Sequence, residues 1–242
     1  MSRRIPVLEI FGPTIQGEGM VMGQKTMFVR TAGCDYSCSW CDSAFTWDGS
    51  AKNNIVMLTA NEIFAQLIDI GGENFNHVTI SGGNPALIAA IDDLIYLLHD
   101  HNIRVALETQ GSKWQDWFLH IDDLTLSPKP PSSGMTTDFK ILDDILTRLK
   151  DAVRNDYSIK IVIFDEIDFE YATTVYKRYP NVPLYLQVGN EDIHSTDDQQ
   201  LTQDLLRKYE WLIDKTIQSK EMNSVRVLPQ LHTLVWGNKR GV

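Results

Sequence analysis

The chain is poor in cysteine. Only 3 of its 242 residues are cysteine, and three thiols cannot form a disulfide framework without leaving one unpaired. The segment 1–6 lacks the apolar core of a secretory signal, and no run approaches the roughly 20 apolar residues that span a membrane. We therefore expect a protein of the reducing cytoplasm that has no membrane partner.

Positive charge is also scarce. The 22 Lys and Arg residues are outnumbered by 32 Asp and Glu residues, which gives a formal net charge of -10. Proteins that bind nucleic acid neutralise phosphates with Lys and Arg, so we expect no nucleic-acid partner. The 43% of hydrophobic residues are typical of a globular protein that is large enough for one core. No repeat or linker interrupts the chain, and we expect a single domain over residues 1–242.

The cysteines that are present lie close together, because Cys34, Cys38 and Cys41 form a CxxxCxxC motif. A [4Fe-4S] cluster held by three cysteines leaves one iron open to a ligand that is not protein. Structural zinc normally has four protein ligands, and here the fourth would have to come from a distant residue such as His77 or His232. A zinc-stabilised binding module without catalysis is the alternative at this point.

Six short runs rich in branched and aromatic residues predict buried strands. They are Thr26–Val29, His77–Ile80, Arg104–Leu107, Asp123–Leu126, Ile159–Ile163 and Leu184–Val188. Apolar residues at helical spacing predict helices over 87–98, 167–179 and 202–215, and a capping-box pattern at Thr59 and Glu62 predicts the start of another. Strands that alternate with helices indicate a parallel sheet with right-handed crossovers.

Polar residues and glycines follow each predicted strand. The segments are Arg30 with the cysteine motif, 81–85, 108–111, 127–129, Asp165 and Gln187. Parallel α/β barrels place their active sites at the carboxyl ends of the strands. The pattern therefore predicts one shared site at this end of the sheet.

Two of these segments resemble the radical S-adenosylmethionine (SAM) enzymes. They are the CxxxCxxC motif after the first strand and Ser81-Gly82-Gly83-Asn84-Pro85 after the second. The resemblance implies an incomplete TIM-type barrel of six parallel strands with outer helices. It also implies that Cys34, Cys38 and Cys41 hold a [4Fe-4S] cluster whose fourth iron binds SAM. Activases of glycyl-radical enzymes share the motif, but the polar groups of Gln16, Glu18 and Arg30 favour a small substrate.

A narrower resemblance extends over nearly the whole chain, in segments 11–19, 28–30, 33–34, 41–43, 108–111, 127–129 and 229–232. These segments are similar to the 7-carboxy-7-deazaguanine synthase family. The resemblance implies conversion of 6-carboxy-5,6,7,8-tetrahydropterin to 7-carboxy-7-deazaguanine with loss of ammonia, in queuosine and deazapurine biosynthesis. It implies Mg²⁺, a homodimer, and an electron donor such as flavodoxin or ferredoxin. A 5′-deoxyadenosyl radical would take hydrogen from substrate C6, so no side chain is expected to be catalytic.

The same resemblance implies the residues of the site. Those expected to bind SAM are Trp40, Asp42, Gly82, Gly83, Asn84, Glu108, Ser127, Pro128, Lys129 and Gln187. Those expected to bind the substrate are Ile15, Gln16, Gly17, Glu18, Arg30, Ser81 and His232. Ser43 would offer Mg²⁺ the oxygen ligand that a hard cation prefers.

Structural roles are the alternatives for several of these residues. Arg30 could form a structural ion pair in place of binding the substrate carboxylate. Glu108 could form a buried salt bridge, and Ser43 could cap a turn. The sequence also departs from the family at two positions, since Asn84 stands where many superfamily members have Glu and Ser43 where Thr is more common. The change at 84 removes a negative charge that would attract the SAM ammonium.

Overall fold

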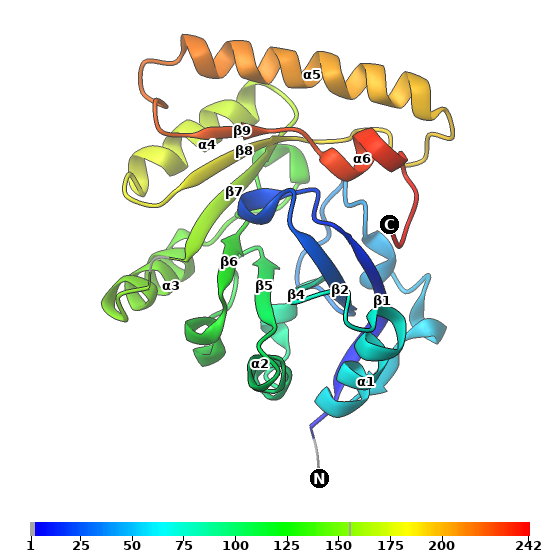
Figure 1. Ribbon diagram of the computed structural model, residues 1–242. Coiled ribbons are helices and arrows are strands. Elements are labelled where there is room, and N and C mark those ends of the chain that lie inside the picture. Colours follow the sequence, from blue (N-terminus) through cyan, green and yellow to red (C-terminus); the bar gives the residue numbers. More distant parts are fainter. Residues whose placement is uncertain (1–2, 155) are drawn as a thin grey trace.

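The computed structural model describes residues 3–154 and 156–242. This part of the chain forms one nine-stranded sheet, in the order β3-β1-β2-β4-β5-β6-β7-β8-β9 (Figure 1). The strands are β1 (Ile5–Ile15), β2 (Lys25–Thr31), β3 (Val56–Leu58), β4 (His77–Gly82), β5 (Arg104–Thr109), β6 (Asp123–Leu126), β7 (Tyr157–Ile163), β8 (Leu184–Val188) and β9 (Arg226–Leu228). Because β3 and β9 are the two edges of this order, the sheet is an incomplete barrel.

The six predicted strands are confirmed as β2 and β4 to β8, which pair in parallel in that order. The prediction of six strands was incomplete. Strand β9 extends the parallel sheet beyond β8, and β1 and β3 extend it antiparallel beyond β2. The sequence of β1 contains Pro6, Glu9 and the pair Gly12-Pro13. These residues interrupt the apolar run by which the other strands could be recognised.

The helices are α1 (Ala60–Gly71), α2 (Ile91–Asp100), α3 (Phe139–Asp151), α4 (Glu166–Arg178), α5 (Asp198–Gln218) and α6 (Leu231–Trp236). The predicted capping box is confirmed at α1: the Glu62 amide donates to Thr59 Oγ1, and the Thr59 amide donates to Glu62 Oε2 at 2.7 Å. The helix expected over 87–98 begins later, because Pro85–Leu87 form a separate 3₁₀ turn. Helix α3 was not predicted.

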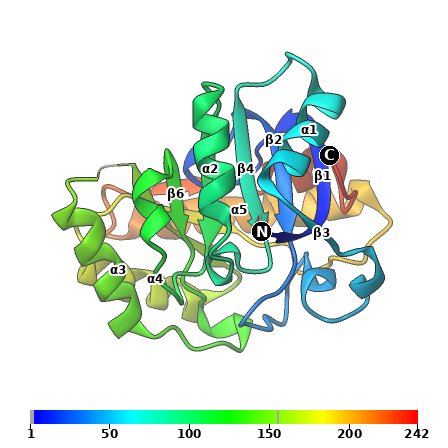
Figure 2. The same ribbon diagram turned by 90° about the horizontal axis from the view of Figure 1, so that it is seen from below.

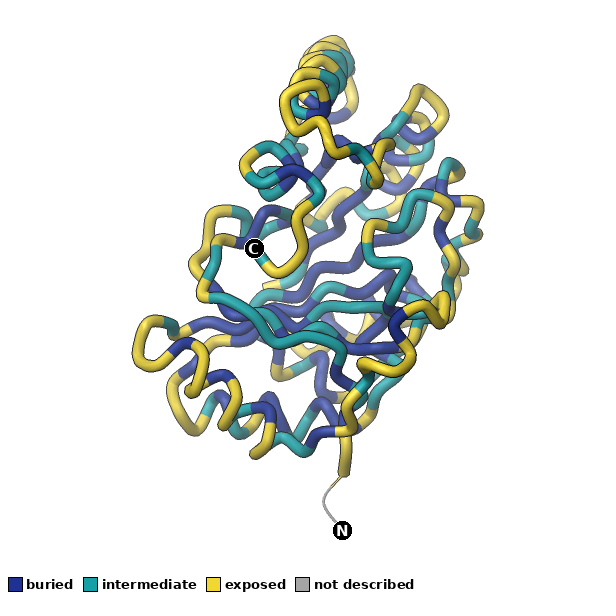
Figure 3. Tube along the Cα trace, turned by 90° about the vertical axis from the view of Figure 1, so that its right-hand side faces the viewer, coloured by how far each residue is buried: buried dark blue, intermediate teal, exposed yellow. Residues whose placement is uncertain are grey.

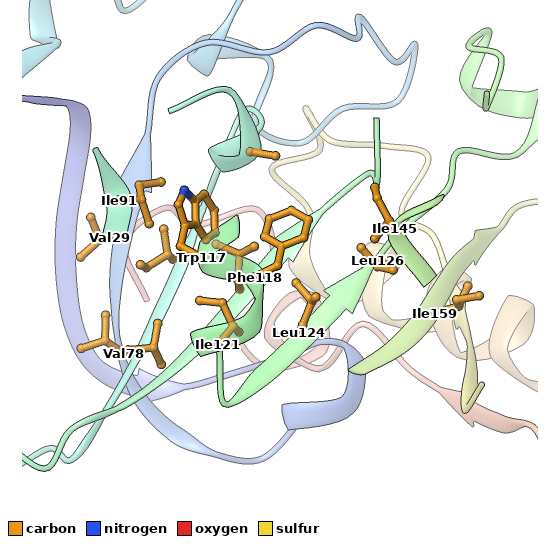
Figure 4. Close-up of a cluster of buried hydrophobic side chains, with 14 of the residues drawn as sticks. Val29, Val78, Ile91, Trp117, Phe118, Ile121, Leu124, Leu126, Ile145 and Ile159 are labelled. Atoms are coloured by element: carbon orange, nitrogen blue, oxygen red, sulfur yellow. The ribbon is translucent and has the colours of Figure 1, made fainter. Parts of the chain in front are cut away.

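Most parallel connections in the described chain pass through an α-helix, but the connection from β5 to β6 has only the 3₁₀ turn Asp116–His120. Trp117 and Phe118 in this turn are buried, with ring centroids 4.9 Å apart and ring planes at 75°. Figure 4 shows both rings among Ile121, Leu124 and neighbouring core side chains. Two aromatic rings thus cover the sheet where a helix is missing.

The core lies between the sheet and its outer helices. Strands are largely buried, whereas outer turns of the helices are exposed (Figure 3). Helix α5 lies along β8 and β9 (Figure 1). Helices α3 and α4 lie next to each other (Figure 2), where Arg178 of α4 binds Asp143 of α3. No helix among the described residues combines the length and apolar character needed to cross a membrane.

Candidate active site

A cavity of about 270 Å³ lies at the carboxyl ends of the parallel strands. Most of the predicted site residues line it. They are Ile15, Gln16, Gly17, Glu18, Arg30, Cys34, Cys38, Trp40, Cys41, Asp42, Ser43, Ser81, Gly82, Gly83, Glu108, Lys129 and His232. The predicted residues that do not line it are Asn84, Ser127, Pro128 and Gln187. Segments far apart in the sequence therefore meet in one place, as the polar strand ends indicated.

The cysteine loop follows β2 and is held by the segment after β6. The Ser39 amide donates to the Ser133 carbonyl at 3.0 Å, and the Trp40 indole donates to Ser132 Oγ at 3.0 Å. Two sulfurs also accept hydrogen bonds. Cys41 Sγ accepts from the Trp47 indole at 3.4 Å, and Cys34 Sγ accepts from Gln110 Nε2 at 3.7 Å. These contacts fix the loop so that its three thiols border the cavity.

Burial raises the pKa of all three thiols, that of Cys38 to about 11. The Lys129 ammonium acts in the opposite direction on each thiol but does not offset the loss of hydration. Thiolates at this place therefore need a bound cation. Thiolates are soft ligands of the kind that hold iron–sulfur clusters. The donor set and its hydrogen bonds fit a [4Fe-4S] cluster.

The glycine-rich turn packs directly against the cysteine loop. A Cβ on Gly82 would lie 2.2 Å from the Thr31 carbonyl oxygen, at the end of β2. The amide of Gly83 donates to that same carbonyl at 3.2 Å. Only glycine allows this approach of two backbones. Both glycines also line the cavity, so their main chain faces the space that a ligand would occupy.

Asn84 is fully buried and bonded within the protein. Its Nδ2 donates to Asp35 Oδ1 at 2.8 Å and to Ser112, and its Oδ1 accepts from the Thr109 hydroxyl at 2.7 Å. The side chain links the cysteine loop to the end of β5. The SAM contact expected of Asn84 stays a prediction, but the structure gives this amide a role in holding the loop.

Glu18 and Glu108 approach one ammonium. Lys160 of β7 lies between them, with its Nζ 2.5 Å from Glu18 Oε2 and in contact with Glu108 Oε1. Burial opposes the charged forms, but the mutual attraction outweighs it. The pKa of Glu18 is lowered as a result, and the pKa of Lys160 is raised. Gln230 Nε2 donates to the other oxygen of Glu18 at 2.9 Å. The carboxylate is thus ionised and fixed.

Arg30 lies between a carboxylate and a hydroxyl group at the cavity wall. Its Nε donates to Glu9 Oε2 at 3.0 Å and its Nη1 to Ser43 Oγ at 2.8 Å. Arg240, near the end of the chain, binds the other oxygen of Glu9 and lies over the Phe45 ring at 3.5 Å. Two guanidinium groups thus share the Glu9 carboxylate, and guanidinium N–H groups at this wall could donate to an anionic group of a ligand.

Comparisons with known proteins agree with this geometry. Residues 28–179 match the model of the Radical SAM superfamily. The chain is 68% identical over its full length to 7-carboxy-7-deazaguanine synthase of Bacillus subtilis (strain 168), all of which is covered. It is 64% identical to the synthase of the same name from Bacillus cereus, with 99% of each chain covered.

The chain belongs to the 7-carboxy-7-deazaguanine synthase family of radical SAM enzymes. A crystal structure of QueE from Escherichia coli is similar in fold, with a TM-score of 0.67, 20% identity and 95% of each chain covered. Family membership decides among the interpretations left open by the cysteine motif. It favours a radical SAM enzyme over a zinc-stabilised module, and a synthase over an activase.

Family membership does not by itself explain the predicted residues that lie behind the cavity wall. Gln187 Oε1 accepts from the Gly19 amide at 3.2 Å, and it thereby fixes the loop that carries Glu18. Ser127 Oγ accepts from Lys129 Nζ at 3.0 Å, which orients that ammonium beside Trp40. Direct SAM contacts by Ser127 and Gln187 stay predictions.

His232 lies in the cavity wall, its Nδ1 3.8 Å from Glu18 Oε1. The other distant histidine, His77, bonds Thr26 at the amino end of β4 and does not line the cavity.

In this radical SAM enzyme several cavity residues were missed by sequence reasoning. They include Lys160, Gln110, Gln230, Phe45 and Arg240. Lys160 carried a signal, because a lysine within the apolar run Ile159–Ile163 needs a partner if the strand is buried. Arg240 had no comparable signal, since its place depends on the path of the chain after α6.

Proposed function

We propose that this chain converts 6-carboxy-5,6,7,8-tetrahydropterin to 7-carboxy-7-deazaguanine with loss of ammonia, in queuosine and deazapurine biosynthesis. One observation carries the proposal. The three thiols, the fixed carboxylate of Glu18 and the guanidinium of Arg30 all border the same cavity. A flat pterin that carries a carboxylate has N–H donors for the Glu18 carboxylate and an anionic group for the Arg30 guanidinium.

Membership in the radical SAM enzymes implies a [4Fe-4S] cluster and SAM. When bound, they would supply the radical chemistry by which hydrogen is removed from the substrate. Cys34, Cys38 and Cys41 would hold the cluster. The main chain of Gly82 and Gly83 would accept the SAM ammonium, and Lys129 would attract its carboxylate. The task of the protein is to bind and orient both molecules and to exclude water.

On the substrate side, Arg30 would pair with the carboxylate of the pterin. The fixed carboxylate of Glu18 would accept from its N–H groups, and Gln16 lies next to it, where its Oε1 accepts from the Glu18 amide at 3.2 Å. The Ser81 hydroxyl is buried without a hydrogen-bond partner among the described residues. Since an unpaired buried hydroxyl is costly, a ligand atom is its expected partner.

The finer assignments rest on chemistry alone. Mg²⁺ would bind Ser43 Oγ, which lies 3.0 Å from Asp42 Oδ1 in an oxygen-rich corner of the cavity. Arg30 also binds this hydroxyl, so the metal and the substrate carboxylate would have to engage Ser43 and Arg30 together. We further propose a single domain over residues 1–242, a homodimer, a cytoplasmic location and reduction by flavodoxin or ferredoxin.

The test is anaerobic turnover. The protein is reconstituted with iron and sulfide, supplied with reductant, Mg²⁺, SAM and the pterin, and its products are followed by mass spectrometry. We expect 7-carboxy-7-deazaguanine in amounts that depend on both SAM and the pterin. If 5′-deoxyadenosine forms without that product, the substrate assignment is wrong. If neither forms on a protein with an intact cluster, the proposed reaction as a whole is wrong.

A further inference from the structure

Lys160 is the most buried cation at the cavity, and nothing in the proposed reaction uses it. Its side chain is 1% exposed and lies in β7 between two buried isoleucines. A lysine is almost never buried to this extent unless it is paired. Here it is paired twice, with a carboxylate from the loop after β1 and another from the end of β5. A residue that only completed the strand would not need two such partners.

The two carboxylates differ in what else binds them. Glu18 has Gln230 and His232 at its second oxygen. In the described part of the chain, Glu108 has no hydrogen-bond or ion-pair partner besides Lys160, and its side chain is 28% exposed at the cavity. Its second oxygen is therefore available to hydroxyl donors of a ligand. In the proposed function Glu108 faces the SAM ribose, and Glu18 faces the pterin.

The charges around Lys160 explain why both carboxylates need it. Among the described residues, Lys160 is the one cation that contacts both Glu18 and Glu108. The other titratable groups nearby are Asp42 and His232, which have side-chain atoms within 4.8 Å of Glu18, and Tyr185, the register partner of Lys160 in β8. The Tyr185 hydroxyl already accepts from Arg226 at 2.7 Å. Without the ammonium, two partly buried carboxylates would face each other, and one would take up a proton.

We propose that Lys160 is a positioning residue that keeps Glu18 and Glu108 ionised together and fixed as hydrogen-bond acceptors, one for the substrate and one for SAM. The inference rests on the proposed function for the identity of the two ligands. The ion-pair geometry stands independently of it. A protonated glutamate would present an O–H donor where the ligand needs an acceptor. Loss of Lys160 should therefore weaken the binding of both ligands, because one glutamate takes up a proton and both lose the contact that fixes them.

The decisive variant is Lys160→Met, which keeps a long apolar stem and removes the charge. We expect at least a tenfold rise in the SAM dissociation constant of the reconstituted protein and a comparable rise in KM for the pterin, because a shift of one pKa unit corresponds to a factor of about ten. Both losses should shrink as the pH is raised and the protonated carboxyl ionises. The matched control is Lys177→Met, which breaks a surface Lys–Glu pair with Glu221 and should change neither constant.

A second readout needs no turnover. Infrared spectra of the cluster-free protein should show the carbonyl band of a protonated carboxylic acid in Lys160→Met and not in the wild type. The double variant Lys160→Met with Glu108→Gln should lose that band and regain thermal stability, but not SAM affinity. A Lys160→Met protein without the band and with wild-type constants would overturn the proposal. A wild type that binds SAM but does not convert the pterin would instead contradict the proposed function.

Discussion

A Cβ on Gly83 would lie 2.1 Å from the carbonyl oxygen of Gly33, the residue that precedes the first cysteine of the motif. The amide of Asn84 donates to the same carbonyl at 2.7 Å. The glycine-rich turn and the cysteine loop thus meet backbone to backbone. The shape of one depends on the shape of the other, so a change in the turn is also a change at the thiols.

Gly83→Ala should therefore impair cluster assembly as well as SAM binding. The added methyl must push the two backbones apart, and this displaces the loop that carries the cysteines. We expect iron content after reconstitution to fall to less than half of the wild-type value. The control is Gly49→Ala, where a φ of 87° makes alanine strained but the space around the Cβ is open. Equal iron content in both variants would show that the shape of the cysteine loop does not depend on the glycine-rich turn.

Cys38→Ala should abolish the cluster and turnover and leave the fold intact. The thiol is 8% exposed and the alanine methyl fills part of its space, so the loss of packing is small. Iron and sulfide analysis, the absorbance of the reconstituted cluster and far-UV circular dichroism measure the three effects. Retention of a full cluster and full turnover would show that Cys38 is not a ligand.

Arg30→Ala should raise KM for the pterin about 10- to 150-fold, the range that corresponds to the loss of a hydrogen bond to a charged group. Cleavage of SAM in the absence of the pterin should be preserved, because the cluster ligands and the glycine-rich turn are unchanged. Steady-state kinetics and 5′-deoxyadenosine formation separate the two effects. Arg148→Ala, which breaks an exposed pair with Asp144, is the control. An unchanged KM would restrict Arg30 to its pair with Glu9.

Thr59→Ala should destabilise the protein by about 1 kcal/mol, the usual cost of losing an N-cap. The substitution removes the acceptor for the Glu62 amide and one half of the capping box of α1. Urea unfolding of the cluster-free protein measures the change. Thr147→Ala, inside α3, is the control and should be neutral or stabilising, since alanine is the better helix former.

The Glu18–Lys160 pair should make stability depend on pH at both extremes. The pKa of Glu18 is lowered from its ordinary 4.5, so its contribution is complete above about pH 4.5 and is lost as the pH falls. The pKa of Lys160 is raised from 10.5, so its contribution is complete below about pH 10.5 and is lost as the pH rises. The unfolding free energy of wild type minus that of Lys160→Met should fall as the pH drops below about 4.5 and as it rises above about 10.5. A difference that stays constant to pH 3 would contradict it.

Much of the fold could be predicted from sequence because the parallel strands are buried on both faces. Such strands give short continuous apolar runs, and β6 and β8 were predicted with their observed bounds. Strand β1 lies nearer the edge of the sheet and is half-buried, so polar residues and prolines interrupt its pattern. Helix α3 did carry a helical pattern, with Leu142, Ile145, Leu146 and Leu149 buried, but its many charged residues concealed it.

The site was predictable where chemistry and motif coincide, at the cysteines and the glycine-rich turn. It was not predictable where a role depends on which side of the wall a side chain occupies. Asn84 and Gln187 lie in segments that reach the cavity, but their amides turn inward and hold backbone and side chains of neighbouring loops. Sequence spacing specifies the strand end; packing decides which residues at that end meet the ligand.

The cysteine loop is anchored by the segment after β6, which the ribosome synthesises much later than the loop itself. The Tyr36 hydroxyl donates to the Thr136 carbonyl across a sequence separation of 100 residues, and the ribosome needs roughly 5–20 s to synthesise that length. Until then the emerging thiols lack the contacts that aim them at the cavity. We therefore expect the loop to reach the geometry that could hold a cluster only after residues 132–136 have emerged. A cluster inserted earlier would meet a cysteine loop that lacks its contacts with residues 132–136.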